Sequence, residues 1–153
     1  MDAARQIENL LYRYAELIDA GDFAGLAGLF SRAEIYAPAH DTVFRGADEV
    51  AAMYRASTRL YADTGTPKTR HIISNAIIEV DEQAGQATAR SCYTVMQATE
   101  ALPLQAIISG RYHDRFQASS QGWHFARREM HVDLIGDLSQ HLLFDLQEQS
   151  HGT

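Results

Sequence analysis

Cysteine, long apolar runs and cofactor-binding motifs are scarce or absent in this sequence, and each shortage excludes something. Cys92 is the only cysteine in 153 residues, so no internal disulfide can form, and a reducing cytoplasm is the expected compartment. No apolar run reaches the roughly 18 residues that a membrane span requires, and the first residues lack the apolar stretch of a signal peptide. Neither a phosphate-binding loop nor a dinucleotide fingerprint occurs, so we predict no cofactor.

Basic residues are also few. The chain carries 13 Lys and Arg residues against 20 Asp and Glu residues, which gives a net charge of -7. This balance argues against nucleic acid or an anionic membrane as a partner. A hydrophobic content of 46% and a charged content of 22% are ordinary for a globular protein, and the length favours one domain.

Apolar residues recur at spacings of three and four positions in the first part of the chain, which predicts helices. A first helix is expected over residues 2–20, with an apolar stripe of Ile7, Leu10, Leu11, Tyr14, Leu17 and Ile18. Gly21 ends this helix, and Asp22 caps a short helix that reaches residue 30. A third helix is predicted over residues 47–60, with inward side chains at Val50, Met53, Tyr54 and Leu60.

Elsewhere the pattern changes to the alternation typical of strands. A short strand is expected over residues 33–37, and Phe44-Arg45-Gly46 has the pattern of a turn. Longer strands are predicted over residues 69–80, 86–99, 104–116 and 123–135. This order predicts one α+β domain over residues 1–136, with residues 137–153 as a tail or a short helix through Leu138, Leu142 and Leu146. A strongly curved sheet would enclose a space against the helices.

One titratable ring lies where a polar segment meets an apolar, β-branched run. His71 opens the stretch Ile72-Ile73, at a point where a side chain can face a cavity. An unperturbed pKa of about 6.5 suits a histidine to acid and base work near neutrality. A histidine that simply bonds a loop is the plainer alternative. The seven histidines show no metal-binding spacing, so we predict no metal, although His113 and His131 leave a scattered site open.

Several short motifs follow one another along the chain: Tyr14 and Asp19, Leu29-Phe30, Phe44-Arg45-Gly46, His71-x-x-x-Asn75, Gly110-Arg111-Tyr112-x-Asp114-x-Phe116, and Trp123-x-Phe125-x-x-Arg128. In this order they resemble the SnoaL-like branch of the nuclear-transport-factor-2-like superfamily, over about residues 3–134. The resemblance implies a cone-shaped, curved antiparallel sheet wrapped on N-terminal helices, with an apolar pocket inside. Members include dehydratases, a dehydrochlorinase, ketosteroid isomerase, polyketide cyclases, epoxide hydrolases and non-catalytic dioxygenase subunits, so the fold alone does not settle function.

The resemblance also implies catalytic roles. Asp19 matches an aspartate that pairs with the histidine at His71, and Tyr14 matches a tyrosine that polarises a substrate oxygen. Arg128 matches a cationic position that faces the pocket. Each has a plainer alternative: a turn residue for Asp19, core packing for Tyr14, and a surface arginine beside Arg127 for Arg128.

Further residues are expected to contact substrate. Asn75 lies four positions after His71, which places both on one strand face by the period of two. It either orients substrate or bonds a neighbouring strand. Tyr54, Cys92, Thr94 and Tyr112 are candidate pocket-lining residues, with core packing as the alternative for each. Cys92 has no activating partner in the sequence, so we do not predict a nucleophile.

The expected function is a cofactor-independent lyase or isomerase, acting by histidine–aspartate acid–base catalysis on a small hydrophobic, oxygenated ring compound. A homodimer or homotrimer is expected. Two alternatives stay open: a non-catalytic binding or dioxygenase-β-like structural subunit, and a hydrolase that activates water near Asp19. Some family dehydratases carry a second acidic or histidine residue on the strand that holds Ser91-Cys92-Tyr93-Thr94, and this chain has none there.

Overall fold

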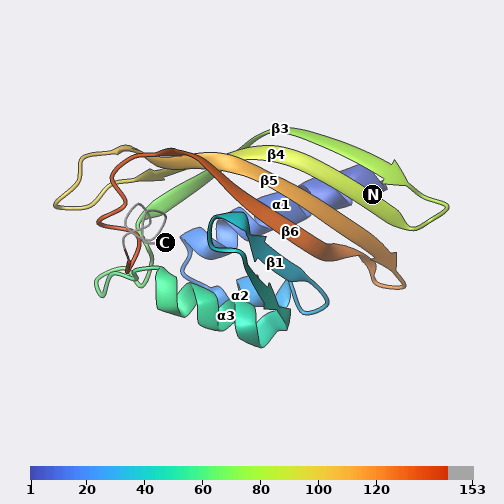
Figure 1. The fold of residues 1–153 in the computed structure, drawn as a ribbon, viewed down its shortest axis with the longest axis horizontal. Coiled ribbons are helices and arrows are strands. Elements are labelled where there is room, and N and C mark those ends of the chain that lie inside the picture. Colours follow the sequence, from blue (N-terminus) through green and yellow to red (C-terminus); the bar gives the residue numbers. More distant parts are fainter. Residues whose placement is uncertain (145–153) are drawn as a thin grey trace.

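The computed structural model describes residues 1–144. Figure 1 shows helices on one side of a curved sheet. The helices are α1 (Ala3–Asp19), α2 (Phe23–Gly28), α3 (Gly46–Ser57) and a short 3-10 turn, η1 (Pro38–His40). The strands are β1 (Glu34–Ala37), β2 (Thr42–Arg45), β3 (Thr69–Asp81), β4 (Gln86–Gln97), β5 (Gln105–Ser119) and β6 (Gly122–Ile135). The predicted α+β class is confirmed.

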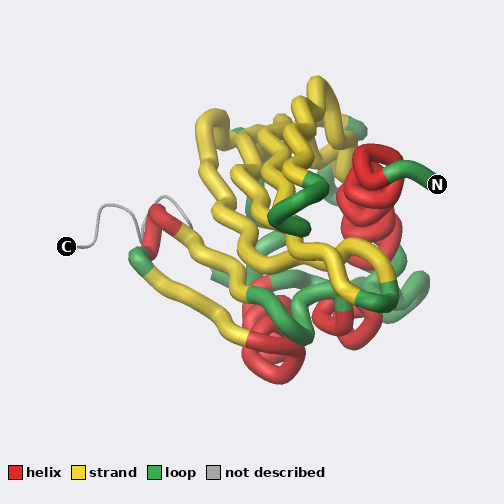
Figure 2. Tube along the Cα trace, turned by 90° about the vertical axis from the view of Figure 1, so that its right-hand side faces the viewer, coloured by secondary structure: helices red, strands yellow, loops and turns green. Residues whose placement is uncertain are grey.

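The sheet has six strands in the order β2-β1-β6-β5-β4-β3, and it does not close. Strands β3 to β6 form the expected antiparallel meander, whereas β1 runs parallel to β6. Figure 2 shows the strands as one bent wall with the helices packed beside and below it. The helices cover only one face, so inward and outward residues alternate along the strands, most regularly in β4, except where bulges shift the register.

Helix α1 supplies the main cover of the concave face. Asp2 caps its first turn by accepting a hydrogen bond from the backbone N–H of Arg5 at 2.8 Å. Its apolar stripe of Ile7, Leu11, Tyr14 and Ile18 is buried against the sheet. The C-terminal end of α1 lies beside the first residues of β3, where Asp19 accepts a hydrogen bond from the backbone of His71.

Two local predictions are wrong. Phe44 and Arg45 belong to β2 rather than to a turn, because they pair with β1. Helix α3 stops at Ser57, and Leu60 is 45% exposed rather than inward, since the chain turns away at Thr58 to bridge Leu142. A tail or a short helix was expected over residues 137–153. Of these, residues 137–144 form turns and no helix, and Leu146 lies outside the described residues.

No helix within residues 1–144 combines the length and the apolar character that crossing a membrane would need.

Candidate functional site

A cavity of about 520 Å³ lies between the concave face of the sheet and the helices. Its wall is built by α1, α3, β1 to β6 and residues 137–144, and most of its lining side chains are apolar or aromatic. This volume falls in the range of small-molecule sites, about 300–1,000 Å³. The few polar groups in the wall therefore determine which chemistry the cavity can support.

The predicted pair of Asp19 and His71 meets at this cavity. The Nδ1 of His71 lies 2.7 Å from the Oδ1 of Asp19, and the backbone N–H of His71 donates to Oδ2 at 2.7 Å. Because a carboxylate can only accept, Nδ1 carries a proton in this contact, which leaves Nε2 as the basic nitrogen. The side chain of His71 is only 5% exposed, so the ring is held in one orientation.

Thr69 also belongs to this hydrogen-bonded group, and the sequence analysis did not identify it. Its hydroxyl donates to the Oδ1 of Asp19 at 2.8 Å. Thr69 precedes His71 by two positions, so the strand alternation that places His71 inward also places Thr69 there. Asp19 thus receives three hydrogen bonds from the start of β3, which position the carboxylate for the imidazole.

Two tyrosines bring their hydroxyls together in the cavity wall. Tyr14 from α1 and Tyr54 from α3 are hydrogen-bonded through their hydroxyl groups. The Tyr14 ring centre lies 6.4 Å from that of His71. Burial raises the pKa of Tyr14 and raises that of Tyr54 well above its ordinary value. Both hydroxyls therefore keep their protons at neutral pH. One proton forms the bond between them, and the other is left to be donated to a substrate oxygen.

Arg128 lies behind the cavity wall rather than in it. The guanidinium is fully buried and bonds both carboxylate oxygens of Asp114, at 2.8 and 2.9 Å. It also lies 3.6 Å from the ring centre of Tyr112 and 4.4 Å from that of Tyr14. Burial opposes the charged form, but the Asp114 carboxylate outweighs it and raises the pKa of Arg128. A permanent cation thus sits directly behind two cavity tyrosines.

The structure separates the expected substrate-binding residues into two groups. Tyr54 and Tyr112 line the cavity. Asn75, Cys92 and Thr94 do not: the amide of Asn75 contacts the Cys92 sulfur at 3.5 Å on the outer face of the sheet. In β4 the inward residues are those that alternate with the predicted ones, namely Tyr93 and Val95.

A β-bulge explains why Asn75 leaves the face of His71. The β3–β4 register shifts between Ser74 and Ile77, and Asn75 has a φ of 40° in the left-handed region. Asparagine tolerates this conformation better than most residues. The extra residue breaks the period of two, so positions four apart no longer share a face.

Sequence reasoning also missed His141. It lines the cavity from the segment that was expected to be a tail, and its ring centre lies 6.5 Å from that of His71. Burial, followed by the charge of His71, lowers the pKa of His141 to about 4, while Asp19 acts in the opposite direction. The one hint in the sequence was the pair of apolar residues that flank His141, Leu138 and Leu142. In the structure both pack in or against the core.

A histidine-rich cluster lies on the opposite face of the sheet. Ligand atoms of His113, Glu129 and His131 lie within 4.8 Å of one another, a spacing that could hold a metal ion. Glu129 already bonds His131 at 3.2 Å and Arg127 at 3.4 Å.

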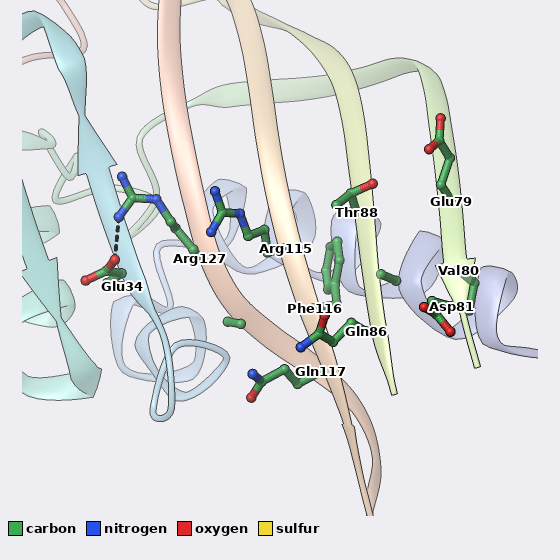
Figure 3. Close-up of a pocket in the computed structure, with 12 residues that line it drawn as sticks. Glu34, Glu79, Val80, Asp81, Gln86, Thr88, Arg115, Phe116, Gln117 and Arg127 are labelled. Atoms are coloured by element: carbon green, nitrogen blue, oxygen red, sulfur yellow. Dashed lines mark hydrogen bonds and ion pairs between the residues drawn. The ribbon is translucent and has the colours of Figure 1, made fainter. Parts of the chain in front are cut away.

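A hollow of about 630 Å³ also lies away from the cavity and shares no lining residue with it. Figure 3 shows Arg127 of that hollow bonded to Glu34, with Arg115 on the neighbouring strand.

Fold and site together define a class of protein: an α+β domain whose curved sheet encloses an apolar cavity with a buried histidine bonded to an aspartate. The chain belongs to the SnoaL-like domain family, whose model matches residues 1–129. A comparison with functionally curated proteins found no match.

Similar solved structures come from Novosphingobium aromaticivorans. An NTF2-like protein with a cystatin-like fold has a TM-score of 0.72 and 22% identity, covering 90% of this chain and 86% of that one. A candidate scytalone dehydratase has a TM-score of 0.67 and 26% identity, with coverages of 88% and 86%. The β subunit of a candidate aromatic-ring-hydroxylating dioxygenase has a TM-score of 0.66 and 19% identity, with coverages of 84% and 88%. The predicted superfamily is confirmed.

Proposed function

We propose that this protein is a cofactor-independent lyase or isomerase that removes a proton from carbon in a small, oxygenated ring compound. The observation that carries the proposal is the Asp19–His71 pair, with 2.7 Å between Nδ1 and Oδ1, at the wall of an apolar cavity. An imidazole fixed in this tautomer presents a base, and the carboxylate stabilises the imidazolium that forms.

The remaining polar groups support a division of roles. Nε2 of His71 takes a proton from the carbon next to a carbonyl, and the electron pair moves onto the carbonyl oxygen. The Tyr14–Tyr54 hydroxyl pair uses one proton in its own hydrogen bond and donates the other to that oxygen as it gains charge. Arg128, behind the ring of Tyr14, favours negative charge at this end of the cavity.

The second half of the reaction returns the proton. In β-elimination the enolate electrons reform the carbonyl and expel a β-hydroxyl group, which takes the proton from His71 and leaves as water. In a double-bond shift the same proton returns to another carbon. Both routes leave the protein unchanged, so neither requires a nucleophilic cysteine or an oxidant.

The cavity wall supports a ring-shaped, largely apolar substrate. Tyr93 and Tyr112 both line the cavity, and their rings stack with centres 4.4 Å apart, which adds aromatic surface to the site. Met53, Val95 and Ile108 add apolar surface around it. The similar candidate scytalone dehydratase supports the same class of substrate.

A non-catalytic subunit is the competing function, because a dioxygenase β subunit shares the fold. A structural subunit needs neither an open cavity nor a carboxylate bonded to an imidazole at its wall. Both features are present, and burying polar groups costs stability unless it serves a purpose. These features support the catalytic proposal over the structural one.

The experiment uses a β-hydroxytetralone, which yields a fluorescent naphthol when it loses water. Purified protein should accelerate naphthol release, and His71→Ala should reduce that acceleration by several orders of magnitude, since it removes the base. Near-wild-type turnover by His71→Ala would contradict the mechanism. No acceleration by the wild-type protein, in this assay and in the proton-exchange assay described below, would favour the structural subunit.

A further inference from the structure

Residues 137–144 close one side of the cavity and are held there by backbone contacts. The backbone N–H of Arg59 donates to the carbonyl of His141 at 2.8 Å, and that of Leu143 donates to the carbonyl of Ser57 at 3.0 Å. The Tyr61 hydroxyl donates to the carbonyl of Gln140 at 2.6 Å. These bonds fix the chain on both sides of His141, so the position of its ring is set by the fold.

The ring of His141 has no polar partner within residues 1–144. The residue is 6% exposed, and its Nδ1 is buried without a hydrogen bond. Leaving a buried polar atom unpaired destabilises the folded state. An apolar residue would fill the same space without that cost, so the imidazole needs a reason beyond packing.

The surroundings of the ring point to a ligand. His141 lines the cavity, and its ring centre lies 6.5 Å from that of His71. Its neighbours in the wall are largely apolar, including Leu138 and Leu142. A small compound in the cavity would thus meet two imidazoles, one bonded to a carboxylate and one without a partner in the described chain.

We propose that His141 is a substrate-binding residue, whose neutral imidazole hydrogen-bonds an oxygen of the compound on which His71 acts. This inference rests on the proposed function, because it names a second polar contact of the same site. The strand of Ser91 to Thr94 offers no second histidine or acid, and His141 brings a second imidazole to the cavity from residues 137–144.

The protonation state of His141 defines its role. Burial and the nearby charge of His71 lower its pKa to about 4, with Asp19 opposing that shift. At neutral pH the ring therefore carries one N–H and one lone pair, and it binds oxygen without delivering a proton. Proton transfer belongs to His71, and orientation of the oxygen belongs to His141.

The test measures the affinity of naphthol, the product of the dehydration assay, by fluorescence titration. His141→Phe keeps a ring in the space but removes the hydrogen bond, and naphthol affinity should fall about tenfold, as expected for one lost hydrogen bond. His141→Gln and His141→Asn each restore a donor at one ring-nitrogen position, and one of them should recover part of the affinity. His124→Gln is the matched control, because His124 lies on β6 outside the cavity and bonds a backbone carbonyl.

A second readout protects the inference against misfolding. In the wild-type protein, naphthol should shift the ring NMR signals of His141, assigned by their absence in His141→Gln. Unchanged affinity in a folded His141→Phe, unshifted His141 signals, or no saturable naphthol binding by the wild type would each overturn the inference. Binding that depends on His141 without any dehydration or proton exchange would contradict the proposed function and leave His141 as a ligand-binding residue of the cavity. Turnover that depends on His71 but not on His141 would do the reverse.

Discussion

The two faces of the sheet use alternate residues of the same strands, yet they treat polar groups in opposite ways. On the outer face charges are exposed and paired with each other, as in Arg111–Asp133 at 2.8 Å, where both side chains are at least 40% exposed. On the inner face polar groups are buried and few. Asp19 meets an imidazole there, Tyr14 meets Tyr54, and His141 meets no described partner.

The two faces therefore use their polar groups differently: the outer face interacts with water, and the inner face can take part in chemistry. Charged pairs on an exposed face contribute little to stability and keep the surface in contact with water. A buried group, by contrast, is constrained in geometry and shifted in pKa by its surroundings. The inner face should therefore be sensitive to single atoms, while the outer face tolerates substitution.

The sharpest comparison exchanges one carboxylate on each face for an amide. Asp19→Asn removes the charge that stabilises imidazolium at His71 and disturbs the tautomer, so dehydration of β-hydroxytetralone should slow by about 10²–10⁴-fold. Asp133→Asn breaks only the exposed pair with Arg111 and should leave the rate unchanged. Equal rates for the two variants would break the distinction between the faces.

The second comparison concerns two arginine–aspartate pairs. Arg128→Met leaves the buried carboxylate of Asp114 uncompensated, and unfolding free energy should fall by about 3–5 kcal/mol in urea denaturation. Arg111→Met breaks the exposed pair and should change the midpoint very little. A small effect of Arg128→Met would mean that Asp114 is protonated in the folded protein.

Acid stability tests whether His141 is buried as a neutral ring. Its folded pKa of about 4 lies below the ordinary value of 6.5, so the folded state resists protonation. The stability that this confers is complete above about pH 6.5 and is lost as the pH falls toward 4. Over that window the wild type should lose about 3 kcal/mol more than His141→Gln, measured by urea denaturation at each pH. Parallel pH profiles would contradict the burial of a neutral ring.

The smallest effect is expected at the residues that the alternation of β4 places outward. Cys92→Ala and Thr94→Val change side chains on the outer face, so naphthol affinity and turnover should stay within about twofold of the wild type. A loss of affinity in either variant would show that the outer face contributes to binding after all.

Much of the fold could be predicted because local patterns carry it. The stripe on α1 and the alternation of the four long strands each follow from side-chain periodicity, and they lead to an α+β domain with a cavity. The pairing of Asp19 with His71 was an implication of family resemblance. In the structure it follows from α1 ending beside the start of β3.

The rest depended on information that periodicity does not contain. One extra residue in the bulge at Asn75 moved it off the face of His71, and no single residue announced the bulge. In β4 the face that Cys92 and Thr94 occupy depends on the register with β3 and β5, which is a tertiary property. His141 was missed because its place in the wall depends on backbone bonds to Ser57 and Arg59, far away in sequence.

Proton exchange from tetralone tests the assignment of His71 as the base without a second step, because this ketone has an acidic carbon next to its carbonyl but no leaving group. The ketone is incubated with the protein in D₂O, and loss of its α-proton signal is followed by NMR. We expect the wild type to accelerate exchange, His71→Ala to abolish the acceleration, and Asp19→Asn to weaken it. Exchange that is equally fast with His71→Ala, or no faster than in buffer for the wild type, would contradict the assignment of His71 as the base.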